Sequence, residues 1–487
     1  MVIPGTIPNF VDGRESPAAD GREFDKLNPA TGARICGVAR SQKADIVAAV
    51  AAARRAQAAW ADTTVVKRGE ILRDAAMMMR ARQGEIAEIV SLETGKSRKD
   101  AFGEAGAAIE MGFFVAGEGR RFYGKTTTSA SPNKAALIMR QPLGVAGLII
   151  AANTPIANVA WKAFPALLCG NAAILKASED TPISAWAAAK IFHEAGVPAG
   201  VFNVVHGFGK EAGAPLVEHA DVDIVSFTGS CEVGRYIQRT AGERLAKVCL
   251  ELGGKNPLIV CDDANLERAA EGATLGAFSN AGQRCAAGSR ILVFDAVYDR
   301  FKQMLLDRTA RLRVGPGDED DFGPVINEEQ LQNMVKSVER AKKNGATVLV
   351  GGQRLTDEAH KSGFYMAPTL IEGAKAGDEI SETELFGPIS ILYRVTNFEE
   401  AITVANASPF GLTAAVYTQS VNRAMTFLSR IQAGVGVVNG PTYGSEPHMP
   451  FGGLKQSGNG AREAGTEALD VYSDWKTIYI NHDPAAV

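Results

Sequence analysis

One cysteine lies in a setting that suits chemistry better than packing. Cys285 is in the segment SNAGQRCAAGSR, a run of small and polar residues that is poorly suited to a hydrophobic core. A free cysteine is most often a small buried hydrophobe, and that alternative stays open for Cys285 taken alone. A thiol with small neighbours is also open to attack on a substrate, which is the chemistry of a cysteine nucleophile.

Glu251 and Asn153 lie where predicted strands end. Glu251 interrupts an apolar strand in CLELGGKNP, directly before a Gly-Gly turn. A buried carboxyl is normally hydrogen-bonded, has a raised pKa or lines a cavity. Near a thiol, a carboxyl of raised pKa can act as a general base. Asn153, in AANTP, either caps the helix that follows or directs its amide at a developing oxyanion.

Lys176 and Glu179 follow another predicted strand, in ILKASED. Open α/β sheets bind ligands at this end of their strands. A carboxylate there accepts hydrogen bonds from ribose hydroxyls and repels a 2′-phosphate, so Glu179 favours NAD over NADP, which stays possible. The alternative is a solvated surface ion pair.

Two glycine-containing junctions follow further strands. GFGKEAG, with Gly209 and Gly213, is one residue too long for the usual dinucleotide fingerprint. SFTGSCEVG, with Gly229 and Gly234, begins a helix whose first backbone amides could face a phosphate. Ordinary turn chemistry explains either junction equally well.

Alternating strands and helices must position these residues. From about residue 137 onward, short apolar runs alternate with amphipathic segments, as in a parallel sheet covered on both faces. We therefore expect two successive α/β blocks. A helical region over 41–119 precedes them, with Ser41 as the cap of its first helix. The predicted helices in the two blocks are 156–170, 184–196, 210–220, 232–243, 266–282, 298–312, 398–408 and 422–431.

The segment VYSDWKTIYI (471–480) reads as a terminal strand. No later element of the chain can pair with it. We therefore expect its partner elsewhere, for example on another subunit.

Composition limits the class of protein. With 487 residues the chain is long enough for two or three domains, and 46% hydrophobic and 22% charged residues are typical of a soluble globular protein. The formal net charge is −4, and no basic cluster with interleaved aromatic residues occurs. We expect no nucleic-acid partner.

Targeting and metal signals are not found. The N-terminal segment has no basic region followed by an apolar one, and the longest apolar runs are too short to span a bilayer. We therefore expect a cytoplasmic protein with no membrane partner. Six cysteines without C-x-x-C spacing, and histidines without metal-ligand spacing, predict neither a disulfide scaffold nor a structural metal.

Over almost its whole length the sequence resembles the aldehyde dehydrogenase superfamily, of the NAD(P)-dependent, non-acylating type. LELGGKNP is similar to the family's glutamate motif, and SNAGQRCAAGSR is similar to its G-Q-x-C cysteine motif. FTGS, ELFGP and MPFGGLKQSGNG are similar to the cofactor-helix, ribose-contacting and C-terminal motifs. Five motifs in the family's order make the resemblance specific.

The resemblance implies a catalytic role for three residues. Cys285 would attack the aldehyde carbon, while the side chain of Asn153 and the backbone N–H of Cys285 hold the oxyanion of the thiohemiacetal. Hydride transfer to the nicotinamide would leave a thioester. Glu251 would activate the water that hydrolyses this thioester to the carboxylic acid.

The resemblance also implies cofactor contacts. Lys176 and Glu179 match the positions that contact the adenosine ribose. Gly229 and Ser230 match positions near the pyrophosphate, and Glu384 and Phe386 match positions near the nicotinamide ribose.

In fold, the resemblance implies a doubly wound cofactor-binding domain, an α/β catalytic domain and a small β bridging element. The expected boundaries are 1–119 with 143–253 for the first, 254–440 for the second, and 120–142 with 470–487 for the third. Pairing across subunits would give the terminal strand its partner. We expect a homodimer or a homotetramer.

Substrate choice is less constrained. Many relatives have Pro-Trp-Asn-Phe-Pro where this chain has AANTP, so Thr154 replaces an aromatic residue and widens the predicted tunnel. Trp161 and Tyr443 favour an aromatic or medium-chain aldehyde. The alternative is a semialdehyde whose carboxylate is received by Arg284 or His448, unless Arg284 forms a structural salt bridge that points away from the tunnel.

The residues also bear on two other functions of the same fold. An acylating relative would pass the acyl group to coenzyme A, but such relatives generally lack a carboxylate in the motif of Glu251. A structural relative that has lost catalysis would lack Cys285, Glu251 or Asn153, and all three are present.

Overall fold

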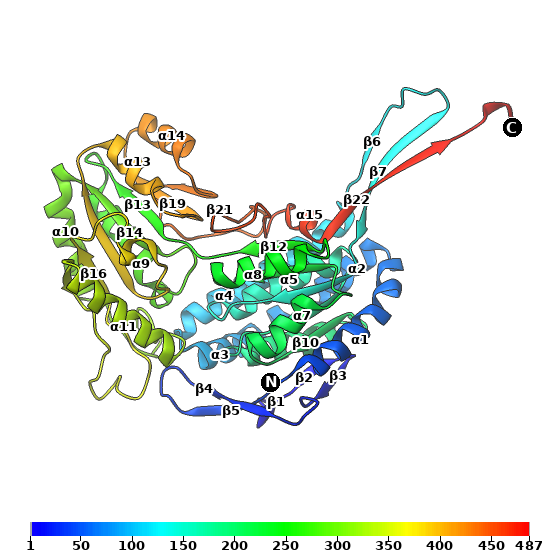
Figure 1. The fold of residues 1–487 in the computed structure, drawn as a ribbon, viewed down its shortest axis with the longest axis horizontal. Helices are drawn as coiled ribbons and strands as arrows, with labels where there is room; N and C mark the ends of the chain where they lie inside the picture. Colours follow the sequence, from blue (N-terminus) through cyan, green and yellow to red (C-terminus); the bar gives the residue numbers. More distant parts are fainter. Residues whose placement is uncertain (1, 487) are drawn as a thin grey trace.

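Two lobes and a projecting arm make up the molecule (Figure 1). The structure is a computed structural model, and it describes residues 2–486. The first lobe holds the helices labelled α1 to α8, the second lobe holds α9 to α14, and the arm is built from β6, β7 and β22.

The first lobe is built on a seven-stranded sheet with the order β12-β11-β8-β9-β10-β2-β3. Its strands are β2 (Asn9–Val11), β3 (Arg14–Ser16), β8 (Val145–Ile149), β9 (Ala172–Lys176), β10 (Phe202–Val205), β11 (Ile224–Thr228) and β12 (Lys247–Glu251). The strands from β8 to β12 are parallel, and β2 joins β10 antiparallel. The chain order reverses between β8 and β11, so the carboxyl ends of these strands border the crevice where such sheets bind ligands.

Helices cover both faces of this sheet. One face packs against α2 (Val65–Ala81), α3 (Gln83–Thr94), α4 (Arg98–Gly117), α5 (Pro155–Leu168) and α6 (Pro182–Glu194). The other packs against α1 (Lys43–Asp62), α7 (Ala214–Glu218) and α8 (Cys231–Gly242). Successive strand residues alternate between the two cores, because Leu148 and Leu175 lie in the first and Ile149 and Ile174 in the second.

The second lobe holds another seven-stranded sheet, with the order β15-β16-β17-β14-β13-β19-β20. Its strands are β13 (Asn256–Val260), β14 (Gly288–Phe294), β15 (Thr347–Val350), β16 (Thr369–Glu372), β17 (Ile389–Val395), β19 (Thr413–Tyr417) and β20 (Val435–Val438). Its helices are α9 (Leu266–Phe278), α10 (Asp295–Thr309), α11 (Glu328–Lys343), α12 (Glu379–Glu382), α13 (Phe398–Asn406) and α14 (Val421–Arg430). Only β15 is antiparallel to its neighbour. The predicted α/β class with two parallel sheets is confirmed.

The arm corrects the prediction for the terminal strand. β22 (Ser473–Asn481) pairs antiparallel with β7 (Lys134–Pro142) over nine residue pairs, and β6 (Lys125–Thr127) lies on the other side of β7. The strand therefore finds its partner within its own chain, not across subunits. Its outer edge has no strand beside it within residues 2–486. A short helix, α15 (Ala468–Tyr472), leads into β22.

Smaller elements complete the chain. β1 (Thr6–Ile7), β5 (Arg34–Ala39) and β4 (Glu23–Leu27) form a three-stranded sheet, and β18 (Phe410–Gly411) pairs with β21 (Leu454–Lys455). Short 3-10 turns occupy Glu118–Arg120, Ser279–Gly282 and Pro484–Ala486.

Three predicted helix boundaries are wrong. Gln42, not Ser41, is the N-cap of α1, because the Ser41 hydroxyl is hydrogen-bonded to the Asn9 side chain instead. The helix predicted over 210–220 is a π-helical turn, Gly209–Gly213, followed by the short α7. The helix predicted over 266–282 ends at Phe278, because the backbone then enters the left-handed region.

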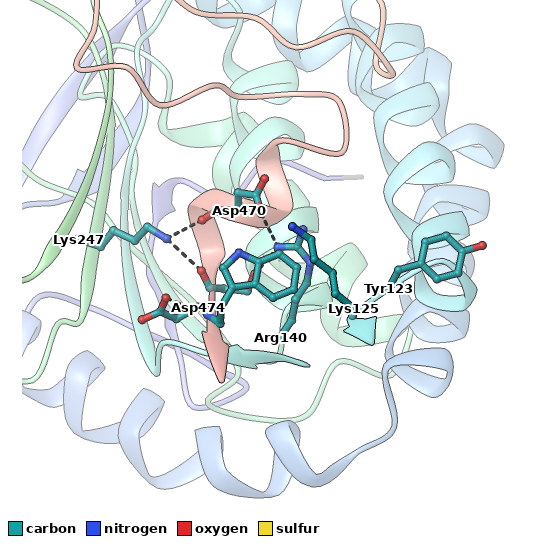
Figure 2. A pocket seen from close by; sticks show the side chains of 9 residues that line it. Tyr123, Lys125, Arg140, Lys247, Asp470 and Asp474 are labelled. Carbon is teal, nitrogen blue, oxygen red and sulfur yellow. Dashed lines mark hydrogen bonds and ion pairs between the residues drawn. The ribbon is translucent and has the colours of Figure 1, made fainter. Parts of the chain in front are cut away.

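A polar cavity of about 510 Å³ lies where the arm meets the first lobe (Figure 2). Lys247 donates to the carbonyl oxygens of Asp470, at 2.5 Å, and Ser473, at 3.0 Å. Arg140 forms an ion pair with Asp470 at 2.6 Å and lies over the Trp475 ring, 4.1 Å from its centroid. These contacts fix the base of the arm against β12, and none of the predicted catalytic residues lines the cavity.

Within residues 2–486, no helix is long and apolar enough to cross a membrane. The six cysteines are free, and no group of three or more His, Cys, Asp or Glu side chains is arranged to hold a metal in that range.

Candidate active site

Five of the predicted site residues lie at the carboxyl edge of the first sheet. Asn153 follows β8, and Lys176 is the last residue of β9. Gly229 and Ser230 follow β11, and Glu251 is the last residue of β12. The parallel strands therefore bring together five residues that are up to 98 positions apart in the sequence (153 to 251).

Cys285 follows a strained turn in the connection between α9 and β14. Asn280, Ala281 and Gly282 all have left-handed backbones, with φ of 54°, 53° and 65°. Asn256 Nδ2 donates to the Cys285 carbonyl oxygen at 2.7 Å, which anchors the residue to the second sheet. The side chain is half-buried. Asn280 and Ala281 are consecutive non-glycine residues in a sparsely populated conformation, which is typical of a functional turn held by its surroundings.

The Cys285 thiol holds its proton in this environment. Burial, together with the nearby carboxyl groups of Glu384 and Glu251, raises its pKa to about 12, although the Ala286 N–H and the Arg284 charge oppose the shift. Nucleophilic attack therefore requires a group that accepts the thiol proton.

Glu251 is a buried carboxyl without a hydrogen bond. Neither of its carboxyl oxygens has a partner within residues 2–486, and the residue is 5% exposed. Burial raises its pKa well above the usual range, and the neighbouring Glu463 adds to this shift, whereas Lys162 and Arg462 oppose it. A Cβ atom at Gly452 would lie 2.8 Å from Glu251 Oε1, so a glycine is needed beside this carboxyl.

A buried polar cluster beside Glu251 was not predicted from the sequence. Lys162, on α5, forms an ion pair with Glu463 and donates to Ser226 Oγ at 2.9 Å. Ser226 Oγ donates to Glu463 Oε1 at 2.7 Å. Lys162 is fully buried, and a single lysine inside the apolar stretch IANVAWKAFPALLCG was the signal available for it.

Asn153 does not cap the helix after it. The N-cap of α5 is Thr154, and the Asn153 side chain makes one long contact, in which its Oδ1 accepts from Asn158 Nδ2 at 3.5 Å. Its Nδ2 group donates no hydrogen bond within the described residues, so this amide is free to donate to a ligand. Asn158 Nδ2 instead donates to Thr154 Oγ1 and to the Thr154 carbonyl oxygen, each at 3.0 Å.

Lys96, Glu104 and Asn280 contact the Asn153 segment and were also missed. Lys96 Nζ and Asn280 Nδ2 donate to the Asn153 carbonyl oxygen, and Glu104 accepts from the first amides of α5. Glu104 lies within a long helix and Lys96 in a loop, and neither carries a local motif.

Lys176 and Glu179 form the predicted pair at the end of β9. Lys176 Nζ lies 2.9 Å from Glu179 Oε2, and the Glu179 side chain is 39% exposed. Burial favours a higher pKa for Glu179, but the Lys176 charge and hydrogen bonds to the carboxylate lower the pKa overall. An ionised carboxylate thus stands at the ligand-binding edge of the sheet.

Gly229 and Gly234 are required by packing within the protein. A Cβ atom at Gly229 would lie 2.4 Å from the Phe227 ring, and one at Gly234 would lie 2.6 Å from Leu252. Ser230 is the N-cap of α8, and its hydroxyl accepts from the Val233 N–H at 3.4 Å. The helix N-terminus is therefore held close to the strand ends.

Gly209 and Gly213 differ from that pair. A Cβ atom at either position would meet no other atom within 4 Å. The left-handed residue of this junction is Gly207, with φ of 136°. Close packing inside the protein therefore does not explain Gly209 or Gly213.

Glu384 packs against the turn between Glu251 and the second lobe. Its Oε1 accepts from the Gly254 N–H at 3.0 Å, and a Cβ atom at Gly253 would lie 1.9 Å from its Oε2. Burial raises the pKa of Glu384 to about 7. Phe386, two residues further on, has a left-handed backbone with φ of 53°.

Arg284 forms no ion pair within residues 2–486, so the predicted alternative of a structural salt bridge is wrong. Its guanidinium lies over the Tyr443 ring, 4.7 Å from the centroid, and its Nε donates to Ser279 Oγ at 3.3 Å. A positive charge without a counter-charge therefore lies next to the nucleophile.

Trp161 and His448 do not join this cluster through any direct contact in the described chain. Trp161 packs edge-on against Phe451, with 5.5 Å between ring centroids. His448 lies 3.7 Å from Glu446, and its side chain is 53% exposed. A carboxylate in the described loop already faces His448, which makes it a poorer anion receptor than Arg284.

Comparison with known proteins agrees with this geometry. The model of the aldehyde dehydrogenase family matches residues 16–478, and the chain belongs to that family. This confirms the family predicted from the motifs. The chain is 38% identical over 478 residues to the α-ketoglutaric semialdehyde dehydrogenase of Bacillus subtilis, covering 98% of each protein. It is 37% identical over 473 residues to the α-ketoglutarate semialdehyde dehydrogenase of Haloferax volcanii, covering 97% of this chain and 98% of that one.

A solved structure shares the fold. The betaine aldehyde dehydrogenase of Staphylococcus aureus in complex with NAD+ superimposes with a TM-score of 0.96 and is 33% identical. The match covers 98% of this chain and 95% of that one.

Proposed function

We propose that this protein is an NAD-dependent semialdehyde dehydrogenase, which oxidises an aldehyde that also carries a carboxylate. The observation that carries this proposal is the unpaired guanidinium of Arg284 beside Cys285. Opposite charges attract strongly in a partly desolvated site, and a guanidinium binds a carboxylate with two parallel hydrogen bonds. The names of two full-length relatives, both ketoglutaric semialdehyde dehydrogenases, support the same substrate class over an aromatic or medium-chain aldehyde.

In this proposal the Glu251 carboxylate takes the thiol proton of Cys285 and passes it to solvent, and Cys285 Sγ then attacks the aldehyde carbon. The free amide of Asn153 and the backbone N–H of Cys285 donate to the oxyanion that forms. NAD, when bound, accepts hydride from the former aldehyde carbon. Glu251 then takes a proton from the water that hydrolyses the Cys285 thioester, which releases the dicarboxylic product.

Glu251 must be deprotonated for that last step. Its raised pKa makes it a strong base once its proton has left. The negative charge of Glu463 raises the pKa of Glu251, and the positive charge of Lys162 lowers it. The buried Lys162–Glu463 ion pair therefore sets how readily Glu251 ionises.

The residues present fit an NAD cofactor. Lys176 and the ionised Glu179 would hold the adenosine ribose, and Glu179 disfavours a 2′-phosphate. The amides at the start of α8 and the open space at Gly209 and Gly213 would accept the phosphates. Glu384 and Phe386 would contact the nicotinamide ribose.

We also propose the domain division and an oligomer. The cofactor-binding domain would be 1–119 and 143–253, the catalytic domain 254–440, and the oligomerisation element 120–142 with 470–487. The arm extends away from both lobes (Figure 1). On its edge strand, Tyr479 is 60% exposed and Ile480 is 51% exposed. A homodimer or homotetramer would cover this edge, and sedimentation at a mass near 51.4 kDa would contradict it.

The substrate class is tested with Arg284→Met, which keeps the aliphatic stem and removes the charge. NADH formation is followed with four substrates: α-ketoglutaric semialdehyde, a neutral aldehyde of similar length, benzaldehyde and betaine aldehyde. We expect kcat/KM for the semialdehyde to fall about 10- to 100-fold, and that for the neutral aldehydes to change little.

Arg268→Met is the matched control, because Arg268 is an exposed arginine on α9. It should leave every substrate unaffected. An equal loss on all substrates with Arg284→Met, or a wild-type preference for benzaldehyde, would overturn the semialdehyde proposal.

A further inference from the structure

The carbonyl oxygen of Asn153 accepts hydrogen bonds from both lobes. Lys96 Nζ, from the first lobe, donates at 2.7 Å, and Asn280 Nδ2, from the turn before Cys285, donates at 3.3 Å. The residue that carries the proposed oxyanion amide is therefore joined directly to the segment of the proposed nucleophile. Its free amide and its held carbonyl are parts of one residue.

Lys96 is itself firmly held. It is 4% exposed and lies between Gly95, the C-cap of α3 with φ of 76°, and Ser97, the N-cap of α4. Its carbonyl oxygen accepts from Ser91 Oγ at 2.8 Å, and its Nζ also lies 2.6 Å from Glu104 Oε2. The buried ammonium thus lies between two acceptors, the Glu104 carboxylate and the Asn153 carbonyl oxygen, which limits its movement.

Asn280 is held on the other side. It is 4% exposed, and its Nδ2 group also donates to the Gln283 carbonyl oxygen at 3.2 Å. Its backbone φ of 54° is a conformation that asparagine tolerates better than most residues. The strained turn thus directs this side chain toward Asn153.

We propose that Lys96 and Asn280 are positioning residues, which hold the Asn153 carbonyl so that its amide faces the oxyanion formed at Cys285. The role rests on the proposed function of Asn153. A displacement of about 1 Å at a catalytic group can lower the rate about 100-fold. Two hydrogen bonds that hold the Asn153 carbonyl in place would therefore increase the rate of the reaction at Cys285.

A purely structural role for Lys96 would be to neutralise Glu104. Glu104 accepts from the Ile156 N–H at 3.0 Å and from the Ala157 N–H at 3.4 Å, at the start of α5. At the start of α6, however, the buried carboxyl of Glu93 caps the helix in the same way without a lysine in contact in the described chain. Helix capping alone therefore does not require Lys96.

Two reactions of the same thiol separate the roles. Acyl transfer from p-nitrophenyl acetate to Cys285 passes through an oxyanion, whereas alkylation by iodoacetamide does not. In Lys96→Met we expect the rate of acyl transfer to fall about 10- to 100-fold and the alkylation rate to change less than about twofold. An equal loss in both reactions would show a structural role and overturn the proposal.

A double variant gives the sharper test. If Lys96 acts through Asn153, then Lys96→Met should change acyl transfer by less than about twofold when Asn153 is already alanine. The same fold loss in both backgrounds would overturn the proposal. If Asn153→Ala by itself leaves acyl transfer unchanged, the proposed function of Asn153 fails, which is a separate outcome.

Asn280→Gly provides a second variant, because glycine keeps the left-handed turn and removes the donor. We expect the same selective loss of acyl transfer, about 3- to 10-fold, since its hydrogen bond is longer. Glu93→Gln is the matched control at α6, and it should leave the ratio of the two rates unchanged. A wild-type ratio in Asn280→Gly, or an altered ratio in Glu93→Gln, would contradict the assignment. This test still applies if Lys96→Met does not fold.

Discussion

Helices α5 and α6 begin with the same three residues and differ in what surrounds their first turn. Thr154 and Thr181 are the N-caps, both with φ of −141° and neither with a side-chain capping bond, and each is followed by Pro-Ile. A buried glutamate from another helix supplies the acceptors in both cases. Glu104 does so for α5, and Glu93 does so for α6, where it accepts from the Ile183 N–H at 2.8 Å.

The two carboxyl groups have different electrostatic settings. Glu104 pairs with Lys96 at 2.6 Å, with both side chains buried. Glu93 has no ion pair in the described chain, and burial raises its pKa to about 7 despite its hydrogen bonds and the more distant Lys26. A helix start can thus be capped by a carboxyl that is only partly ionised near pH 7. Lys96 is found at the start of α5, where the preceding loop carries Asn153, and no lysine is in contact at the start of α6 in the described chain. We therefore relate Lys96 to the position of Asn153.

The largest expected effect comes from removing each cap. Glu104→Ala leaves Lys96 buried without a counter-charge, so we expect a loss of about 3–5 kcal/mol in the free energy of unfolding. Glu93→Ala leaves only uncapped amides and a small cavity, with an expected loss of about 1–3 kcal/mol. Urea unfolding of both variants measures the difference. Equal losses in the two variants would contradict this difference between α5 and α6, because the buried charge of Lys96 would then make no contribution to the loss at α5.

The second effect concerns pH. The folded-state pKa of Glu93 is raised, so the folded protein binds this proton more tightly than the unfolded chain does. The stabilisation is fully present below about pH 4.5 and is lost as the pH rises through about 7. The shift from 4.5 to about 7 corresponds to up to about 3 kcal/mol.

Glu93→Gln removes that titration and keeps the side-chain shape. We expect its stability, relative to wild type, to rise between pH 5 and pH 8, until it matches or exceeds wild type. Glu104→Gln should remain less stable than wild type at pH 8, because Lys96 loses its charged partner. Unfolding midpoints measured at four pH values would check this, and parallel profiles for the two variants would contradict it.

The sequence alone identified those residues whose role is indicated by their immediate neighbours in the chain. Cys285 and Glu251 are marked by their immediate neighbours, and the strand ends followed from the alternation of apolar segments. Lys96 and Glu104 carry no such mark, because their partners lie 57 and 52 positions away and only the packing of α4 on α5 brings them together. The salt bridge expected for Arg284 failed for the same reason, since a guanidinium's partner cannot be read from its neighbours.

The arm shows the same limit at longer range. The terminal strand was recognised from its own residues, but its partner β7 lies more than 330 positions earlier in the register Ser473↔Pro142 to Asn481↔Lys134. A strand needs the same sequence pattern whether its partner is in its own chain or in another subunit. The pairing within the chain follows from the path of the chain, because α15 leads into β22 and Lys247 binds the carbonyl oxygens of Asp470 and Ser473.

The smallest effect distinguishes the two N-cap threonines. Thr181 Oγ1 is buried and has no hydrogen-bond partner in the described residues, whereas Thr154 Oγ1 accepts from Asn158 Nδ2 at 3.0 Å. Valine has the same shape as threonine without the hydroxyl. We therefore expect Thr181→Val to raise the free energy of unfolding by about 1 kcal/mol and Thr154→Val to lower it by about 0.5–1 kcal/mol. The opposite signs can be measured by thermal unfolding of the two variants in parallel. Changes of the same sign would mean that the two helix starts are equivalent at this position, and that the difference between them lies in the Lys96 contact alone.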